Sequence, residues 1–229
     1  QYIKSILFYI KTDSILNEFT TEKRINSLIE ETKKTEFPEK AVLQNITAKV
    51  IWNYYNMNRF RFAQRSEIED FVPEDIATWS LGQLIKEVNS LYKSSIEQAN
   101  ELQKISVSDY STLLVKGNDD KIRTTLYDVL AGNALDFFAN GESGVTEPVY
   151  AFVIDKNEFF LPSEQFIKYD IKAQDKSSMK YQALQLFQFM ENRYLLSGNR
   201  ESLYNLALQR VKFCYDNSVS EDKEKSFEE

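Results

Sequence analysis

The sequence predicts an all-α protein built as an antiparallel array of helices. Residues 80–104 show this best: apolar side chains recur at i, i+3, i+4 and i+7 steps from Leu81 to Leu102, behind a Ser80-x-x-Gln83 capping box. Only 6 Gly and 4 Pro occur among 229 residues, which favours long regular elements. We expect tetratricopeptide-like helix pairs within a single helical domain, 1–229, although no regular sequence repeat is visible.

Apolar periodicity and end signals place the other helices. They are expected at residues 1–12, 21–35, 38–62 and 122–138, with two more from Met179 to a stop near Gly198 and from a cap at Asn199 to Cys214. The 38–62 segment starts with Pro38 in a first-turn position and has apolar residues on almost every face, which predicts a central helix with neighbours on most sides. Asn140-Gly141 is expected to end the 122–138 helix.

Residues 141–175 interrupt the helical pattern. Glu147-Pro148-Val149-Tyr150-Ala151-Phe152-Val153-Ile154 and, after it, Phe159-Phe160-Leu161-Pro162 are typical of extended chain. A loop of this length without structure is unusual in a compact domain, so we expect an aromatic-rich crossover held against a helix surface, with at most a short pair of strands.

Charge and composition argue against several kinds of function. The chain has 28 basic and 35 acidic residues, a formal charge of −7, which disfavours binding to nucleic acid or to an anionic membrane. Histidine is absent, which removes the commonest general base and the imidazole metal ligands. The single cysteine, Cys214, is expected to be a buried small apolar residue. No apolar run is long enough to span a bilayer, and the mid-helix start without Met suggests a fragment of a much longer chain.

The most distinctive stretch is Trp52-Asn53-Tyr54-Tyr55-Asn56-Met57-Asn58-Arg59-Phe60-Arg61-Phe62. It supplies the candidate structural or interaction cluster, whose members are Trp52, Tyr54, Tyr55, Arg59, Phe60, Arg61 and Arg65. As a scaffold, the aromatic ridge around Trp52 and Phe60 would be core; as a docking module, it would be exposed. The arginines and rings also suit stacking on single-stranded nucleic acid. The acidic segment that follows instead favours pairing of these arginines with carboxylates of residues 67–75.

Carboxylates are the remaining groups that are numerous enough for catalysis. The densest cluster comprises Glu67, Glu69, Asp70, Glu74 and Asp75, and a carboxylate-dependent hydrolase would need two of them at a fixed spacing across a cleft. A run of charges between helices is usually solvated. Residues 117–121 lack the alternating ligands of a calcium loop. We therefore expect no enzyme activity, no cofactor, no metal and no catalytic residue.

An ordered set of motifs resembles the N-terminal helical region of large bacterial alpha-2-macroglobulin-like proteins. The matching stretches are Ile51-Trp52-Asn53-Tyr54-Tyr55 with Asn58-Arg59 and Arg65, Asp75-Ile76-Ala77-Thr78-Trp79, Tyr110-Ser111-Thr112-Leu113-Leu114-Val115-Lys116-Gly117-Asn118, Arg123-Thr124-Thr125-Leu126-Tyr127-Asp128, Ala134-Leu135-Asp136-Phe137-Phe138, Pro148-Val149-Tyr150-Ala151-Phe152 and Lys180-Tyr181-Gln182-Ala183-Leu184. Together they cover most of the chain in consistent order.

The resemblance implies a non-catalytic scaffold or interaction module at the front of a protease-trapping, endopeptidase-inhibiting chain. Family members are secreted or periplasmic and often lipid-anchored, so we expect an envelope location, with any anchor outside this segment. The family's trap is a Cys-x-x-Gln thioester; Cys214-Tyr215-Asp216-Asn217 has Asn in place of Gln, so no thioester is expected here. The implied partners are other domains of the same chain and protein or peptide ligands, including proteases. The alternative is a stand-alone helical-repeat binding domain.

Overall fold

The computed structural model describes residues 2–16, 20–63, 72, 75–113, 122–140, 151–220 and 223–224. Helices dominate these residues, and β structure in them is limited to two isolated bridges, so the all-α prediction is confirmed. The pairing characteristic of tetratricopeptide arrays stays a prediction. Backbone contacts divide the chain into two compact units: residues 1–116 with 125–134, and residues 117–124 with 135–229. Each unit is described below by itself.

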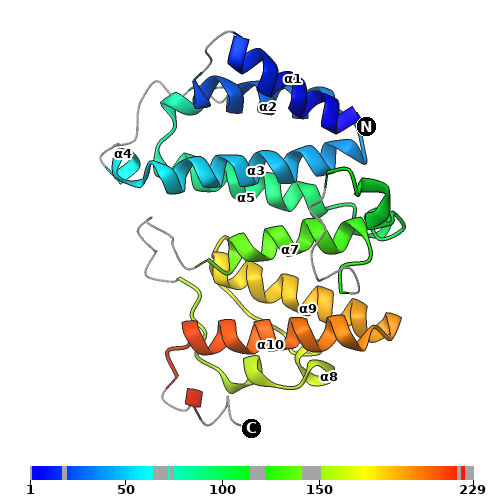
Figure 1. Ribbon diagram of the computed structural model, residues 1–229. Coiled ribbons are helices and arrows are strands. Elements are labelled where there is room, and N and C mark those ends of the chain that lie inside the picture. Colours follow the sequence, from blue (N-terminus) through cyan, green and yellow to red (C-terminus); the bar gives the residue numbers. More distant parts are fainter. Residues whose placement is uncertain are drawn as a thin grey trace. The chain divides into compact units, whose positions relative to one another are not determined.

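The first unit stacks helices around one central helix (Figure 1). Its elements are α1 (Tyr2–Leu16), α2 (Thr21–Lys34), α3 (Glu39–Met57), α4 (Arg59–Ala63), the 3₁₀ turn η1 (Ile76–Thr78), α5 (Leu81–Ile96), α6 (Ala99–Leu102), the 3₁₀ turn η2 (Val107–Tyr110) and the first part of α7 (Leu126–Phe138). α3 packs on both α2 and α5, and α1 packs on α2. The central position predicted for the 38–62 segment is therefore confirmed for α3.

Buried polar groups inside this unit are paired. Asn45 of α3 is 1 % exposed. Its Nδ2 donates to Ser95 Oγ on α5 and to the Leu130 carbonyl oxygen on α7, both at 3.0 Å, and its Oδ1 accepts from Asn133 Nδ2 at 2.8 Å. A buried amide needs hydrogen-bond partners, because each buried donor or acceptor left unpaired lowers the free energy of unfolding by about 1–3 kcal/mol. Asn45 thus ties three helices together in one register.

Three predicted helices differ from the structure. The 80–104 segment is not one helix: α5 stops at Ile96, Gln98 takes a non-helical conformation, and α6 covers Ala99–Leu102. The 38–62 segment is not one helix: α3 stops at Met57, Asn58 takes a non-helical conformation, and α4 starts at Arg59. The 122–138 helix begins only at Leu126, because Thr125 and Asp128 cap it reciprocally: Thr125 N donates to Asp128 Oδ2 at 2.8 Å, and Asp128 N donates to Thr125 Oγ1 at 3.3 Å. Ile122 therefore lies before the helix.

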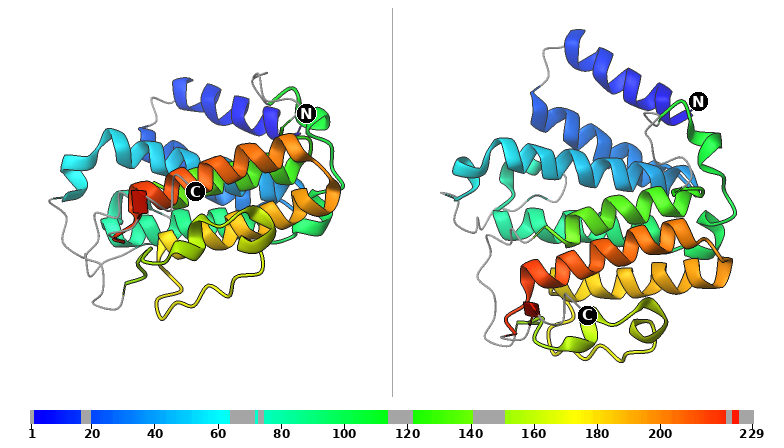
Figure 2. Two further views of the ribbon diagram at one scale, coloured as in Figure 1. Left: turned by 90° about the horizontal axis from the view of Figure 1, so that it is seen from below. Right: turned by 60° about the horizontal axis from the view of Figure 1, so that its bottom comes forward.

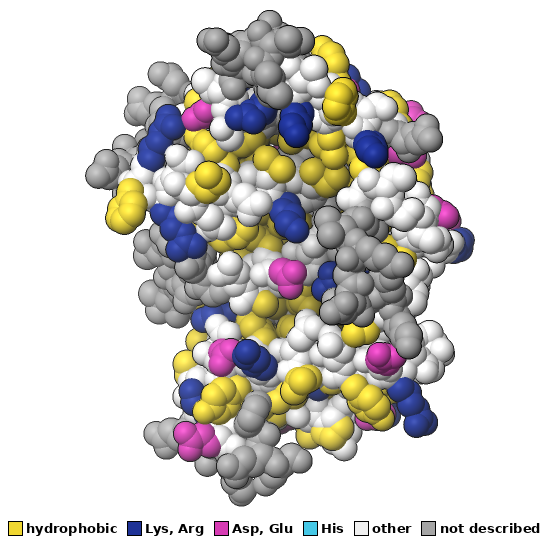
Figure 3. Space-filling model, in the orientation of Figure 1, with side chains coloured by type: hydrophobic (Ala, Val, Ile, Leu, Met, Phe, Trp, Pro, Cys, Tyr) yellow, Lys and Arg dark blue, Asp and Glu magenta, His cyan; other side chains and the backbone are white. Residues whose placement is uncertain are grey.

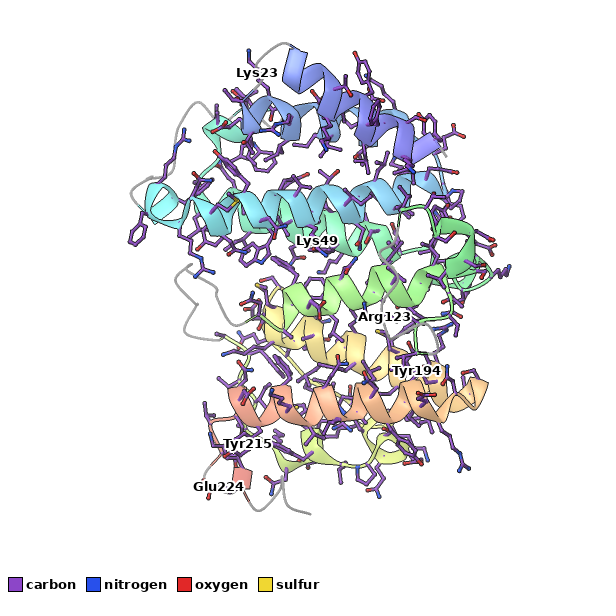
Figure 4. The ribbon with its side chains drawn as sticks, in the orientation of Figure 1. Lys23, Lys49, Arg123, Tyr194, Tyr215 and Glu224 are labelled. Carbon is purple, nitrogen blue, oxygen red and sulfur yellow. The ribbon has the colours of Figure 1, made fainter. Side chains whose placement is uncertain are left out.

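The second unit is a helix hairpin with the crossover packed against it. It contains the end of α7, the 3₁₀ turn η3 (Asn157–Phe160), α8 (Ser163–Phe166), α9 (Met179–Ser197) and α10 (Arg200–Asn217). Gly198 ends α9 in the left-handed region at φ 71°, and Asn199 caps α10 through Ser202 N, as predicted. Tyr194 near the end of α9 and Tyr215 near the end of α10 lie at opposite ends of this antiparallel pair (Figure 4).

The crossover is partly extended and partly helical. From Ala151 the chain is extended, and Ile154 forms a parallel bridge with Ser218, while η3 and α8 follow in a stretch expected to be extended. After α8 the chain forms an open loop before it enters α9 (Figure 2, left). η3 and α8 contact α10 and α9 respectively, so the expected packing of the crossover against a helix surface is confirmed for residues 151–175. Residues 141–150, with the expected stop at Gly141, lie outside the described residues.

Candidate interaction site at the end of α3

The aromatic side chains of α3 form a packed cluster rather than an exposed ridge. Trp52, Tyr54 and Tyr55 are each 7 % exposed or less. The Trp52 and Tyr55 rings lie 5.0 Å apart between centroids, and both tyrosines make edge contacts with Phe62 of α4 at 5.7–5.8 Å. Such pairs add to the free energy of burial. The cluster therefore holds α4 against the end of α3.

One acidic residue, distant in the sequence, accepts hydrogen bonds from two polar side chains of this cluster. Tyr54 Oη donates to Glu22 Oε1 at 2.6 Å, and Arg61 Nη1 donates to the same oxygen at 3.0 Å. The Tyr54 hydrogen bond and the Arg61 guanidinium lower the pKa of Glu22 to about 2 against the opposing effect of burial. We call Glu22, Tyr54 and Arg61 the Glu22 node. Its carboxylate stays ionised at neutral pH and accepts two hydrogen bonds through Oε1, which suits a structural anchor.

The predicted pairing of the arginines with residues 67–75 is wrong for Arg61. The chain turns at Asn58, so Arg61 reaches the first turn of α2 and pairs with Glu22. Arg59 donates to Asn56 Oδ1 at 2.9 Å, and its guanidinium lies 5.8 Å from the centroid of the Tyr55 ring. Arg65 lies outside the described residues.

The proposed acidic cluster is described only at Asp75. Its Oδ1 accepts from Ala77 N and from Asn26 Nδ2, both at 3.0 Å, so Asp75 caps η1 and links it to α2. Glu67, Glu69, Asp70 and Glu74 lie outside the described residues, as do residues 117–121. Within the described part of the chain, no group of three or more metal-ligating side chains comes together.

α4 also presents an exposed surface. Phe60 is 90 % exposed and Met57 is 85 % exposed, whereas Phe62, two residues further on, is 1 % exposed. Arg59 and Arg61 flank Phe60, and half of the Arg61 side chain is accessible. We call Met57, Arg59, Phe60 and Arg61 the α4 surface. In Figure 3 a yellow side chain projects between blue ones at the left edge, where α4 lies in Figure 1.

The structure therefore separates the predicted cluster into two parts. Trp52, Tyr54 and Tyr55 are core, as the scaffold interpretation requires, while Phe60 is exposed, as the docking interpretation requires. Sequence reasoning missed Glu22 as the centre of the node. Its only visible signal was the helix start after Thr20, which places an acidic residue in a first turn.

A second polar node, in the other unit, was also missed. Arg210 of α10 and Glu191 of α9 are 1 % and 0 % exposed, with Arg210 Nε 2.7 Å from Glu191 Oε1. Arg210 also donates to the carbonyl oxygens of Phe159 and Leu161, at 2.5 and 2.8 Å, and its guanidinium lies 4.1 Å from the centre of the Phe166 ring. We call this the Arg210 node. The signal was present in the sequence, because Arg210 falls on the apolar stripe of Leu206 and Cys214.

Cys214 lies beside this node and is fully buried, as predicted. Its Sγ contacts the Phe159 carbonyl oxygen at 3.6 Å. Burial raises the pKa of the thiol to about 12, which outweighs the opposite effect of the nearby Arg210 charge. The thiol is therefore uncharged at neutral pH and is not a prepared nucleophile.

Comparison of the chain with models of protein families, with curated proteins and with solved structures finds no match. The resemblance to alpha-2-macroglobulin-like proteins thus stays a prediction based on the motifs quoted above. Among the described helices, none combines the length and apolar character that a membrane crossing requires.

Proposed function

We propose that this chain is a non-catalytic helical interaction module of an alpha-2-macroglobulin-like, protease-trapping protein of the bacterial envelope. The observation that carries the interaction role is the contrast within α4: Phe62 is buried and fixes the helix, while Phe60 projects between two arginines. Exposed aromatic, Met and Arg side chains on a rigid support are the composition of binding hot spots. The partner is another domain of the same chain or a protein that the chain engages.

The protonation states of Glu22 and Cys214 fit a non-catalytic role. Glu22 is held ionised by two donors, and the Cys214 thiol is buried and neutral. A general acid or base works best with a pKa near the operating pH, and a nucleophilic thiol needs a lowered pKa. The pKa of Glu22 is instead shifted down, away from neutral pH, and the pKa of Cys214 is raised rather than lowered.

Site-specific photo-crosslinking tests the interaction role. A photoreactive phenylalanine analogue replaces Phe60 in the native polypeptide, and the matched control places it at Phe8 of α1, which is also exposed, at 69 %. We expect a defined protein adduct, or an internal crosslink to another domain, from position 60 and none from position 8. Equal labelling at both positions, or none at position 60, contradicts the α4 surface.

The size and location of the native polypeptide test the family assignment separately. An antibody raised against this chain should detect a band far above its own mass of 26.8 kDa in the envelope fraction. A band near 26.8 kDa in the cytoplasm would remove the macroglobulin assignment and leave the stand-alone binding domain.

A further inference from the structure

A groove in the second unit is separate from the α4 surface and does not depend on the function proposed for it. The groove has a volume of about 650 Å³, which lies within the range of ligand-binding clefts. Three aromatic side chains line it, and Phe159 contacts both Phe152 and Tyr169 edge-on, with ring centroids 6.0 and 5.6 Å apart. Its walls are two segments of the crossover, the extended residues 151–156 and the irregular residues 170–174. We call it the crossover groove.

The first wall is a short extended segment with one edge that no described residue pairs. Ile154 pairs with the 218–219 segment on one side, where its carbonyl oxygen accepts from Val219 N at 3.0 Å. In an extended strand, the backbone groups of successive residues point to opposite edges. Val153 and Asp155 therefore direct their backbone groups away from Val219, and these two residues line the groove while Ile154 does not.

Side-chain burial agrees with this strand geometry. Phe152 and Ile154 are buried, at 8 % and 0 % exposed, whereas Val153 is 45 % exposed and Asp155 is also exposed. The alternation fixes the register of the strand, because a slip of one residue would exchange its buried and exposed faces. The free edge thus has a defined position in the structure.

The second wall also offers unpaired backbone. Within the described part of the chain, neither Val153 nor Asp155 has a hydrogen-bonded backbone group, and the same holds for residues 171–174. The N–H and C=O groups of a strand edge are strong, directional pairing sites for another extended chain. The groove therefore has backbone donors and acceptors on both walls.

Two polar side chains, the partly buried Gln188 and the buried Arg210, hold the walls in place without a ligand. Gln188 of α9 donates from Nε2 to the carbonyl oxygens of Phe166 and Tyr169, both at 2.8 Å, next to the second wall. Arg210 holds the carbonyl oxygens of Phe159 and Leu161 close to the first wall. A site that is already ordered loses less entropy on binding.

From these observations we infer that the crossover groove binds an extended peptide segment of a partner protein, which adds as a strand to the free edge at Val153 and Asp155. Strand addition uses main-chain hydrogen bonds for affinity and alternate side chains for selectivity. Phe152 and Phe159 are buried, at 8 % and 2 % exposed, so the partly exposed Tyr169 and the exposed Val153 are the side chains that contact apolar side chains of the peptide. The rim does not select a sign of charge, because it carries three acidic and three basic residues: Asp155, Glu158, Asp170, Lys156, Lys168 and Lys172.

The probe is a phage-displayed library of random octapeptides, selected on the full 229-residue chain, and the enriched peptide is then synthesised. Amide hydrogen exchange followed by NMR reports the binding site. We expect the Val153 and Asp155 amides to exchange fast in the free protein and to be protected by the peptide. Failure to enrich any peptide, or a peptide that leaves both amides unprotected, overturns the proposal.

Main-chain chemistry separates strand addition from other peptide binding. N-methylation of alternate peptide residues should weaken binding at least about tenfold in one register, since it removes main-chain hydrogen bonds to the edge and the methyl groups clash with it. N-methylation of the other alternate set of residues should change affinity less than about threefold, because their N–H groups point away from the edge. Equal tolerance of both registers overturns the proposal.

Two variants test the same edge from the protein side. Val153→Pro removes the backbone donor and should abolish binding of the selected peptide, while Val153→Ala keeps the donor and should bind within about threefold of wild type. If the proline variant has lost its fold by circular dichroism, the N-methylated peptides decide the matter alone. Light scattering tests whether the free protein is instead a dimer in which the Val153 and Asp155 amides are already protected. That result would assign the edge to a second copy of this chain and overturn the proposed peptide binding.

Discussion

Two arginine–carboxylate nodes, one in each unit, use the same charge pair in opposite surroundings. Arg61 and Glu22 have side chains that are 52 % and 20 % exposed, and Tyr54 shares the carboxylate. Arg210 and Glu191 are 1 % and 0 % exposed, and Arg210 also holds two backbone carbonyls. An exposed pair contributes little, whereas breaking a buried one leaves a charge without solvent or partner. The degree of burial therefore determines how much each node contributes to the free energy of unfolding.

The largest expected effect is at the Arg210 node. Arg210→Met leaves Glu191 charged in the core and frees the Phe159 and Leu161 carbonyls, so we expect a loss of about 3–5 kcal/mol in the free energy of unfolding. Urea titration measures it. In a double-mutant cycle with Glu191→Leu, the double variant should lose clearly less than the sum of the single losses. Simple additivity would show that the two charges are not coupled.

Aromatic packing, not the ion pair, is expected to stabilise the end of α3. Trp52→Ala should lower the free energy of unfolding by about 3–5 kcal/mol, because it leaves a cavity under α4. The matched control is Phe60→Ala, which removes an exposed ring and should change stability by less than about 0.5 kcal/mol. An unchanged melting temperature for Trp52→Ala would place this ring at the surface and reverse the assignment of the two residues.

At the Glu22 node, the tyrosine hydroxyl can be removed with little change in shape. Tyr54→Phe loses one charge-assisted hydrogen bond and should cost about 1–2 kcal/mol. It should also raise the pKa of Glu22 from about 2 towards its usual range, because the Tyr54 bond is the main cause of the shift. NMR titration of the Glu22 carboxyl checks this. A pKa that stays near 2 would show that the Tyr54 hydrogen bond is not the main cause of the shift.

The pH dependence of the Glu22 node gives the smallest expected effect. In the folded protein the pKa of Glu22 is lowered to about 2 from its usual 4.5, so the stabilising contribution is complete above pH 4.5 and is lost as the pH falls through 2. Glu22→Gln should therefore be less stable than wild type at pH 7, and the difference should shrink below pH 4 to about zero near pH 2. It should also shrink in about 1 M salt, because the pair is partly exposed. A difference that does not change with pH contradicts the assignment.

Local signals in the sequence were sufficient for most helix ends. The Ser80-x-x-Gln83 box, the Asn199 cap and the left-handed Gly198 all appear in the structure where the sequence placed them. Thr125-x-x-Asp128 has the same kind of signal and shows why α7 starts after Ile122, but the apolar residues before it concealed this boundary. These features depend on neighbours three or four residues away, which is why they can be predicted.

The nodes could not be predicted in the same way, because their partners are distant in sequence. Arg61 finds Glu22 across 39 positions only because the chain breaks at Asn58, and the apolar pattern runs through that break without interruption. The same break turns Phe60 outwards and Phe62 inwards. The charges of Arg210 and Glu191 on buried helix faces were visible, but their pairing required the geometry of the α9–α10 hairpin.

The Arg210 node also constrains the order in which the second unit folds. The carbonyl oxygens of Phe159 and Leu161 obtain their donors from a residue 51 and 49 positions later in the chain. During synthesis the crossover leaves the ribosome well before α10 exists, so these carbonyls must stay in water until Arg210 arrives. The crossover therefore completes these polar contacts only after α10 has been synthesised.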